Sequence, residues 1–344
     1  MDGLLPHRRW LVPLATSCAV AAIAILPGAL PHRETQPSLP DRSSDSILLM
    51  LVASRVNELS GTVVAKADLG LPELPAASNT VSTNSVASLL TGSHTVRVWQ
   101  HGADQQRIAI LDRLAETDLA RSGSTVWSYQ SISGAETLTT LDGLADSALV
   151  QTLLRFVILP IADGPDSIVS VGSPARIAGR DAYGLVIAPK RPGSLVDRVE
   201  LAVDATQGTL LRVRVYAKDK SSPAFQYRFT SISYDEPDAR LFAPVERPVP
   251  PRTVSPVLTA GSGEGSPGGG ASAVSTIGFG WSAVVRLDAP DLAASAKTSL
   301  AAVTRPVPGG RALTTPLLSV LITDDSRLYV GAVPLDTLTA AASQ

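Results

Sequence analysis

An alternation of apolar and polar residues with a period of two constrains this chain most, and it recurs from His94 to Tyr234. Between 211 and 216, leucine or valine at odd positions alternates with arginine or tyrosine at even positions. This period places apolar side chains on one side of a strand and polar ones on the other. The expected strands are 60–65, 95–99, 106–111, 125–129, 136–141, 168–177, 182–188, 198–204, 209–217 and 224–234. Short turns between them favour antiparallel neighbours, so the sequence predicts a mainly β (α+β) fold with a large sheet and one apolar concave face.

Two helices are expected beside this sheet. Ser44 and Asp45 can cap a helix over 46–58, whose apolar residues make a broad buried face. A second helix is expected over 142–160, where Pro160 ends it. Its apolar residues recur at three- and four-residue spacing and include Leu149, Leu153 and Leu154. Such a stripe needs an apolar partner, and the sheet is the obvious one.

The N-terminus carries a membrane-targeting pattern. Basic residues at 7–9 precede an uncharged apolar run from Trp10 to Leu30, which is long enough to cross a bilayer. Positive charge before the run places the rest of the chain outside. No clean small-residue cleavage site follows, which favours an uncleaved anchor over a cleaved signal peptide, and Cys18 is interpreted as an ordinary small residue of the run. Residues 1–42 are therefore predicted to be a signal peptide or membrane anchor plus linker, with the body extracytoplasmic, membrane-anchored or secreted.

The rest of the chain divides into three expected parts. Residues 43–247 hold the helices and strands described above. Residues 248–276 are rich in proline, glycine and serine, which predicts a disordered linker. The last part, 277–344, is predicted to contain a strand, a helix and a hairpin at 281–287, 291–303 and 317–333. It has too few residues for a secure core of its own, so we expect it to pack on the main domain.

Composition argues against several classes of function. Lysine and arginine (29) nearly balance aspartate and glutamate (31) without a large basic cluster, which gives no reason to expect nucleic acid. The single cysteine lies in the N-terminal run, so the body can form no disulfide and no cysteine zinc cluster. His94 and His101 are interpreted as surface or hairpin residues, and no nucleophile elbow, P-loop or dinucleotide motif occurs. We expect no enzyme activity, no cofactor and no metal.

Five motifs occur in an order that is typical of a known superfamily. They are Leu59–Val63, Val98–Gly102, Arg121–Tyr129, Leu185–Lys190 and Asp204–Gly208. Together they resemble the lipoprotein carrier and sigma-factor regulator superfamily, of the LolA and RseB type, over about residues 44–247. The resemblance implies a LolA-like half-barrel domain: a strongly curved, incomplete antiparallel barrel that is covered by helices. Its concave face would hold acyl chains or an extended peptide.

The resemblance also implies site residues. The carriers place an arginine after the tryptophan strand, where it latches a helical lid, and His101 occupies that position here. The expected apolar groove is lined by Val98, Trp127, Tyr129, Leu149, Leu153, Leu154 and Val213. Core packing beneath the helices is the alternative explanation for these side chains.

The expected function is that of an exported lipid- or lipoprotein-binding protein, either free or membrane-tethered, that acts as a carrier or a sensor. Its partner would be a lipid or lipoprotein acyl chain, and its N-terminal segment would associate with the membrane. Two alternatives stay open: a regulator that binds an envelope partner such as an anti-sigma factor by protein contact, and a structural envelope protein. An open apolar cavity favours the first reading, a filled core with an exposed apolar patch favours the regulator, and a polar surface favours the third.

Overall fold

The computed structural model describes residues 37–71, 91–112, 115–140, 159–162, 164–243, 273–288, 297, 301 and 303–343. The apolar N-terminal run, most of the second expected helix and most of the expected linker lie outside these residues. Among the residues described, no helix has the length and apolar character needed to span a membrane.

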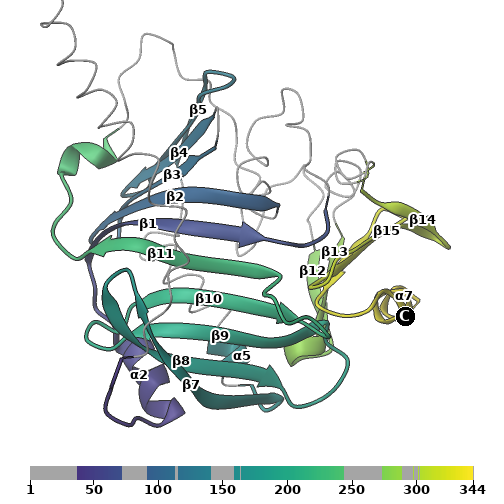
Figure 1. Ribbon diagram of the computed structural model, residues 1–344. Helices are drawn as coiled ribbons and strands as arrows, with labels where there is room; N and C mark the ends of the chain where they lie inside the picture. The colour runs from purple at the N-terminus through teal and green to yellow at the C-terminus, as the bar shows by residue number, and fades with distance from the viewer. Residues whose placement is uncertain are drawn as a thin grey trace, which may run out of the picture. The chain divides into compact units, whose positions relative to one another are not determined.

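Eleven antiparallel strands form the main sheet (Figure 1). They are β1 (Glu58–Ala67), β2 (Gly92–His101), β3 (Gln105–Leu111), β4 (Glu116–Ser122), β5 (Thr125–Gln130), β6 (Ala135–Thr140), β7 (Ser167–Ile177), β8 (Arg180–Pro189), β9 (Val196–Asp204), β10 (Leu210–Ala217) and β11 (Phe225–Ser233). Their order across the sheet is β6-β5-β4-β3-β2-β1-β11-β10-β9-β8-β7, so β1 joins the two halves. The predicted mainly β fold with a large antiparallel sheet is confirmed. The edges β6 and β7 do not pair, so the barrel is incomplete.

Strand β4 is the one strand of this sheet that the sequence pattern does not predict. Its glutamate and aspartate are residues that strands usually lack. In the structure, Asp118 is buried within β4 and accepts hydrogen bonds from Arg107 Nε at 3.0 Å and Nη2 at 2.8 Å. An ion pair within the sheet therefore accounts for polar residues that resemble a loop in the sequence.

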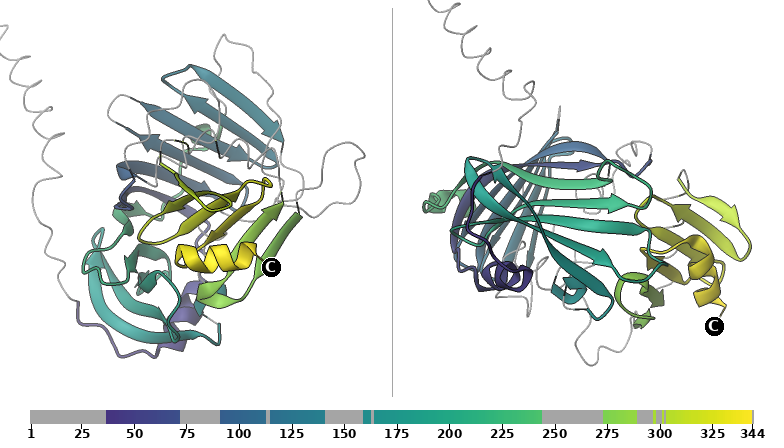
Figure 2. Two further views of the ribbon diagram at one scale, coloured as in Figure 1. Left: turned by 90° about the vertical axis from the view of Figure 1, so that its right-hand side faces the viewer. Right: turned by 60° about the horizontal axis from the view of Figure 1, so that its bottom comes forward.

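Two helices pack on one side of the main sheet (Figure 2). The first, α2 (Ser44–Ala53), begins after Ser43, whose hydroxyl accepts a hydrogen bond from the Ser46 backbone N–H at 3.2 Å. It is shorter than the expected 46–58, because the chain leaves the helix at Ser54 and enters β1 at Glu58. The second, α5 (Leu159–Ala162), overlaps the expected helix over 142–160 only at residues 159–160, because the rest of that helix lies outside the described residues. It also continues past Pro160, so the prediction that Pro160 ends the helix is wrong.

The C-terminal segment forms a second antiparallel sheet of six strands, more than the single strand and hairpin expected, and the expected helix over 291–303 lies mostly outside the described residues. Its strands are β12 (Ala273–Ile277), β13 (Val284–Asp288), β14 (Arg305–Val307), β15 (Gly310–Thr314), β16 (Ser319–Thr323) and β17 (Leu328–Gly331). The expected hairpin is confirmed as β16 and β17. Tyr329, Val333 and Leu338 are almost fully buried in a core that also includes α7 (Leu335–Ala342). Six paired strands and a helix supply the buried surface that a single hairpin would lack.

Among the described residues, three hydrogen bonds connect the C-terminal segment with the main sheet and its β8–β9 loop. The backbone N–H of Leu195 and the hydroxyl of Ser194 both donate to the carbonyl of Ala332, at 2.7 and 3.1 Å. The indole of Trp281, in the short 3-10 helix η4 (Gly280–Ser282), donates to Ser167 Oγ at 2.7 Å. Trp281 is also part of the same hydrophobic cluster as residues of α2 and β8–β10.

Candidate binding faces of the main sheet

The strand register assigns each side chain of the main sheet to one of two faces, because paired residues on antiparallel strands share a face. Val63, Val96 and Ile110 are paired in this way across β1, β2 and β3. We call their face the helix face, since Ile47 and Leu51 of α2 pack on its continuation over β8–β10. We call the other face, which carries Arg97, Arg212 and Arg228, the arginine face.

The expected groove residues are divided between the two faces. Val98 pairs with Ile108, which pairs with Leu119, which in turn pairs with Ser128. Val98 therefore lies on the helix face, and so does Val213. The neighbours of Ser128 in its strand, Trp127 and Tyr129, lie on the arginine face, where their rings stack with centroids 6.1 Å apart. Leu149, Leu153 and Leu154 lie outside the described residues.

His101, the expected latch position, ends β2 on the arginine face. Its Nδ1 is 2.8 Å from Glu58 Oε2 and 3.7 Å from Glu236 Oε1. Its ring lies 6.4 Å from that of Phe242, in the 3-10 helix η3 (Ala239–Phe242). Among described residues, the contacts of His101 are thus with β1 and the segment after β11.

The helix face is apolar under α2 and α5 and in the middle of β1–β4, whereas Gln100, Gln106 and Ser128 are polar residues on it. Under α2 and α5 it is filled by almost fully buried side chains such as Leu185 and Leu201. Beyond them, on β1–β4, the half-buried Val98 and Ile108 pack against a second cluster that contains Val63 and Phe229. An apolar surface therefore continues past the two described helices.

Tyr227 lies between these two clusters and contacts both. Its ring meets that of Phe229 edge-on, with centroids 5.6 Å apart. Its hydroxyl is buried and has no hydrogen-bond partner among the residues that the structure describes. Burial raises the pKa of this phenol, so the hydroxyl keeps its proton and remains a donor.

The arginine face carries a groove of about 410 Å³ over β2, β1 and β11. Most of its lining residues are polar or aromatic, namely Ser60, Thr62, Arg97, Trp99, Ser231 and Ser233, and Gly61 and Ile232 complete the lining. The register of β1 with β11 shifts between Thr62 and Val63, which is a β-bulge at the floor of the groove. The residue pattern in the sequence does not indicate this groove. The alternation of polar and apolar residues indicates only that one side of the strands is exposed to solvent.

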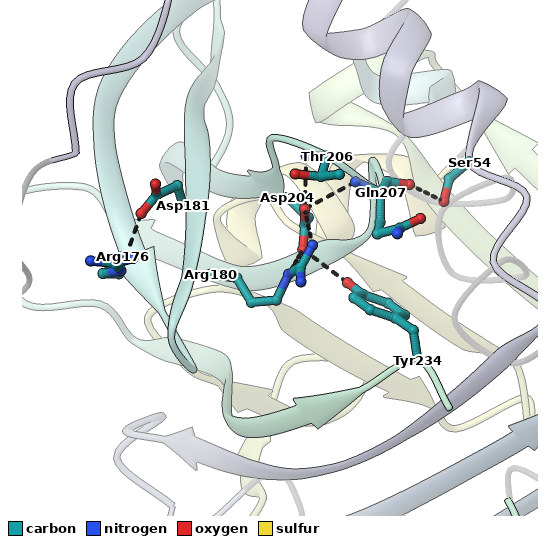
Figure 3. Close-up of polar contacts among 8 residues, drawn as sticks. All are labelled: Ser54, Arg176, Arg180, Asp181, Asp204, Thr206, Gln207 and Tyr234. Carbon is teal, nitrogen blue, oxygen red and sulfur yellow. Dashed lines mark hydrogen bonds and ion pairs between the residues drawn. The ribbon is translucent and has the colours of Figure 1, made fainter. Parts of the chain in front are cut away.

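A buried polar cluster fixes the turn between β9 and β10 (Figure 3). Asp204 is fully buried and accepts a hydrogen bond from Arg180 Nη2 at 3.1 Å and another from Arg180 Nε. The hydroxyl of Tyr234 donates to it at 3.0 Å. The backbone N–H groups of Thr206 and Gln207 add two more bonds, at 2.8 and 3.0 Å. Five donors thus hold one carboxylate.

This cluster also positions α2. Burial acts to raise the pKa of Asp204, but the bonds from Arg180, the two backbone groups and Tyr234 outweigh it, so the pKa lies below its usual value. The ordered turn accepts a hydrogen bond from Ser54, at the end of α2, on the carbonyl of Gln207 at 2.8 Å. Because every charge in the cluster is used within it, we interpret the cluster as structural rather than catalytic. The described residues also contain no group of three possible metal ligands.

No protein-family model matches the chain, and no curated protein matches it. Solved structures with a similar fold include MucB, at 17% identity and a TM-score of 0.41, covering 86% of this chain and 94% of that chain. The MucA/MucB complex of Pseudomonas aeruginosa gives 21% identity and a TM-score of 0.46, covering 87% and 96%. A LolA superfamily protein from Nitrosomonas europaea gives 9% identity and a TM-score of 0.24, covering 59% and 99%. The similar structures therefore include MucB and LolA-superfamily proteins, the group that the sequence motifs resemble.

Proposed function

We propose that this chain is an extracytoplasmic binding protein whose helix face holds an acyl chain of a lipid or lipoprotein. The observation that carries the proposal is the apolar surface of Val98, Ile108 and Leu119, which continues past α2 and α5 and is only partly buried. Apolar side chains of this kind, with few polar groups among them, are typical of lipid-binding surfaces. The uncharged run from Trp10 to Leu30 supports an exported and membrane-associated location.

The hydroxyl of Tyr227 adds a polar feature to this surface. A buried donor without a partner costs about 1–3 kcal/mol, which a bound acceptor would recover. An ester or carboxyl oxygen at the head of an acyl chain is such an acceptor. Tyr227 packs against the same cluster as Val98 and Ile108, so an acyl chain along the apolar surface could present its head to this hydroxyl.

Native mass spectrometry with lipid extraction tests the proposal on the protein purified from a host's extracytoplasmic compartment. We expect co-purifying acyl-chain lipid that is lost in Ile108→Glu, because a buried carboxylate opposes an apolar ligand. Leu138→Glu is the matched control, since Leu138 is exposed on the arginine face. A protein that has no lipid, and takes up none when it is offered, would contradict the proposal.

A protein-binding regulator is the second candidate, and strand β7 favours it. This strand is an edge of the main sheet, and Ile168 and Val171 on it are 51% and 50% exposed. An exposed edge with apolar side chains can accept an additional strand from a partner. Two of the similar structures are complexes of MucB with MucA, so protein binding is known for proteins of similar fold. In-cell cross-linking should capture an envelope protein that Val171→Lys releases, and no such loss would reject this candidate.

A further inference from the structure

The groove on the arginine face lies in a surface with an excess of positive charge. Six basic side chains lie on its strands β1, β2 and β9–β11: Lys66, Arg97, Arg198, Arg212, Arg214 and Arg228. Glu200, in the middle of this area, is already bound by Arg198 at 2.9 Å and by the Tyr216 hydroxyl at 3.2 Å. The six basic side chains of these strands thus outnumber the acidic ones on the same face, which are Glu58, Glu200 and Asp204.

Two of these arginines are available to an anion. Within the described residues, the side chains of Arg97 and Arg228 make no hydrogen bond or ion pair. Arg97 is exposed and lines the groove, whereas the Nε of Arg228 is buried. Arg228 also stands directly opposite Arg212 in the register of β10 and β11, an arrangement of like charges that destabilises a sheet. A bound oxyanion would reduce this repulsion and provide an acceptor for the Arg228 guanidinium group.

The rest of the groove fits a sugar ring. Trp99 forms part of its wall, and the guanidinium of Arg107 lies 5.6 Å from the centre of the indole. Asp118 holds Arg107 in turn, so the indole has a fixed orientation. Hydroxyls of Ser60, Thr62 and Ser231 can each donate and accept hydrogen bonds. An aromatic wall beside several hydroxyls matches the apolar C–H face and the hydroxyl edge of a pyranose.

We propose that this groove binds a sugar ring that carries a phosphate or a carboxylate. Arg97 would contact the anion, Trp99 the face of the ring, and the serine and threonine hydroxyls its edge, while Arg228 on β11 would add positive charge beside the groove. The site is on the other side of the sheet from the acyl surface. This proposal is therefore tested independently of the function proposed above.

Titration calorimetry with the purified protein tests the proposal. Glucose 6-phosphate and glucuronate are the anionic probes, glucose tests the ring alone, and inorganic phosphate tests the anion alone. We expect an anionic sugar to bind at least about tenfold more tightly than either glucose or inorganic phosphate, because ring and charge both contribute. Arg97→Gln should weaken this binding about tenfold or more, since it removes a charged donor. Arg305→Gln, which removes an exposed charge on the second sheet, should leave it unchanged.

Two further comparisons separate the remaining outcomes. Vesicles of phosphatidylcholine with and without phosphatidylinositol distinguish a free saccharide from a lipid headgroup. Binding of the soluble anionic sugars indicates a free saccharide as the ligand. Binding only to the vesicles that contain phosphatidylinositol, with loss of this binding in Arg97→Gln, indicates a lipid headgroup. Equal affinity for inorganic phosphate and glucose 6-phosphate, unchanged in Trp99→Leu, would overturn the sugar site. Absence of binding to every probe at about 10 mM would overturn it as well.

Discussion

The substitution Asp204→Asn should strongly destabilise the protein. Asp204 is fully buried and is the common acceptor for Arg180, Tyr234 and two backbone N–H groups. An asparagine keeps the shape but loses the charge, and its amide turns a donor toward other donors. Hydrogen bonds to a charged group are worth more than neutral ones, and removing one partner of a buried pair is costly, so we expect a loss of about 3 kcal/mol. Arg180 remains 30% exposed, which places this value at the lower end for such pairs.

The assay is reversible unfolding in urea at pH 7, followed by circular dichroism and supported by thermal melts. A loss of that size corresponds to a melting temperature lower by about 6–12 °C. Asp181→Asn is the matched control, because the side chains of Arg176 and Asp181, which form an ion pair, are 55% and 38% exposed (Figure 3). An exposed pair contributes about 0–1 kcal/mol. Equal effects of the two substitutions would refute the reasoning.

The dependence on pH supplies a second check. The folded-state pKa of Asp204 lies below its value in the unfolded chain, which is about 3.9. The carboxylate therefore contributes its full stability above that pH, and the contribution disappears as the pH falls through the folded-state pKa. Asp204→Asn has no such group, so the difference between wild type and variant should narrow below about pH 4. A difference that stays constant from pH 7 to about pH 3 would show that the charge is not the cause.

Three other substitutions test single contacts. Gly208→Ala should cost more than about 2 kcal/mol in urea unfolding, because φ is +70° and a Cβ would lie 2.4 Å from a carbonyl oxygen of α2. Gly70→Ala, with φ +63° and open space around it, should cost only about 1 kcal/mol. Tyr227→Phe removes an unpaired buried donor, so the melting temperature should stay the same or rise, and the variant should release bound lipid. A lower melting temperature would instead indicate that the Tyr227 hydroxyl makes a hydrogen bond that stabilises the fold. Trp281→Phe should lose about 1–2 kcal/mol and make the second sheet more sensitive to limited proteolysis, because it removes the bond to the main sheet; unchanged proteolysis would count against that bond.

Ten of the eleven strands of the main sheet follow from alternation and turn residues, because both signals are local. The exception, β4, depends on a contact that is not local: Asp118 is acceptable in the sheet only because Arg107 on the neighbouring strand binds it. The C-terminal segment shows the same limit. Its β14 is three residues long, too short to display a period, and is fixed by pairing with β15.

The candidate site was harder to predict for a related reason. Alternation shows that Trp127 and Tyr129 share a face within their strand, but not whether that face is the one that carries Val98. The answer requires the register of every strand between them, and β4, absent from the pattern, is one of those strands. The cluster at Asp204 is also only partly predictable from the sequence. Its turn is visible in the sequence, whereas Arg180 and Tyr234 join it only through the pairing of the strands.

Strand β1 belongs to both proposed sites, so it determines whether they are independent. Gly61 faces the helix face, where a Cβ would lie 2.7 Å from the ring of Phe229. The next residue, Thr62, lines the groove on the arginine face, beside the bulge. Arg97→Gln changes only an exposed side chain, so it should leave lipid retention unchanged if the sites are independent. Gly61→Ala displaces Phe229 and the backbone under the groove, so it should weaken both lipid retention and sugar binding. Loss of lipid in Arg97→Gln would instead show that an anion on one face alters packing on the other through β1.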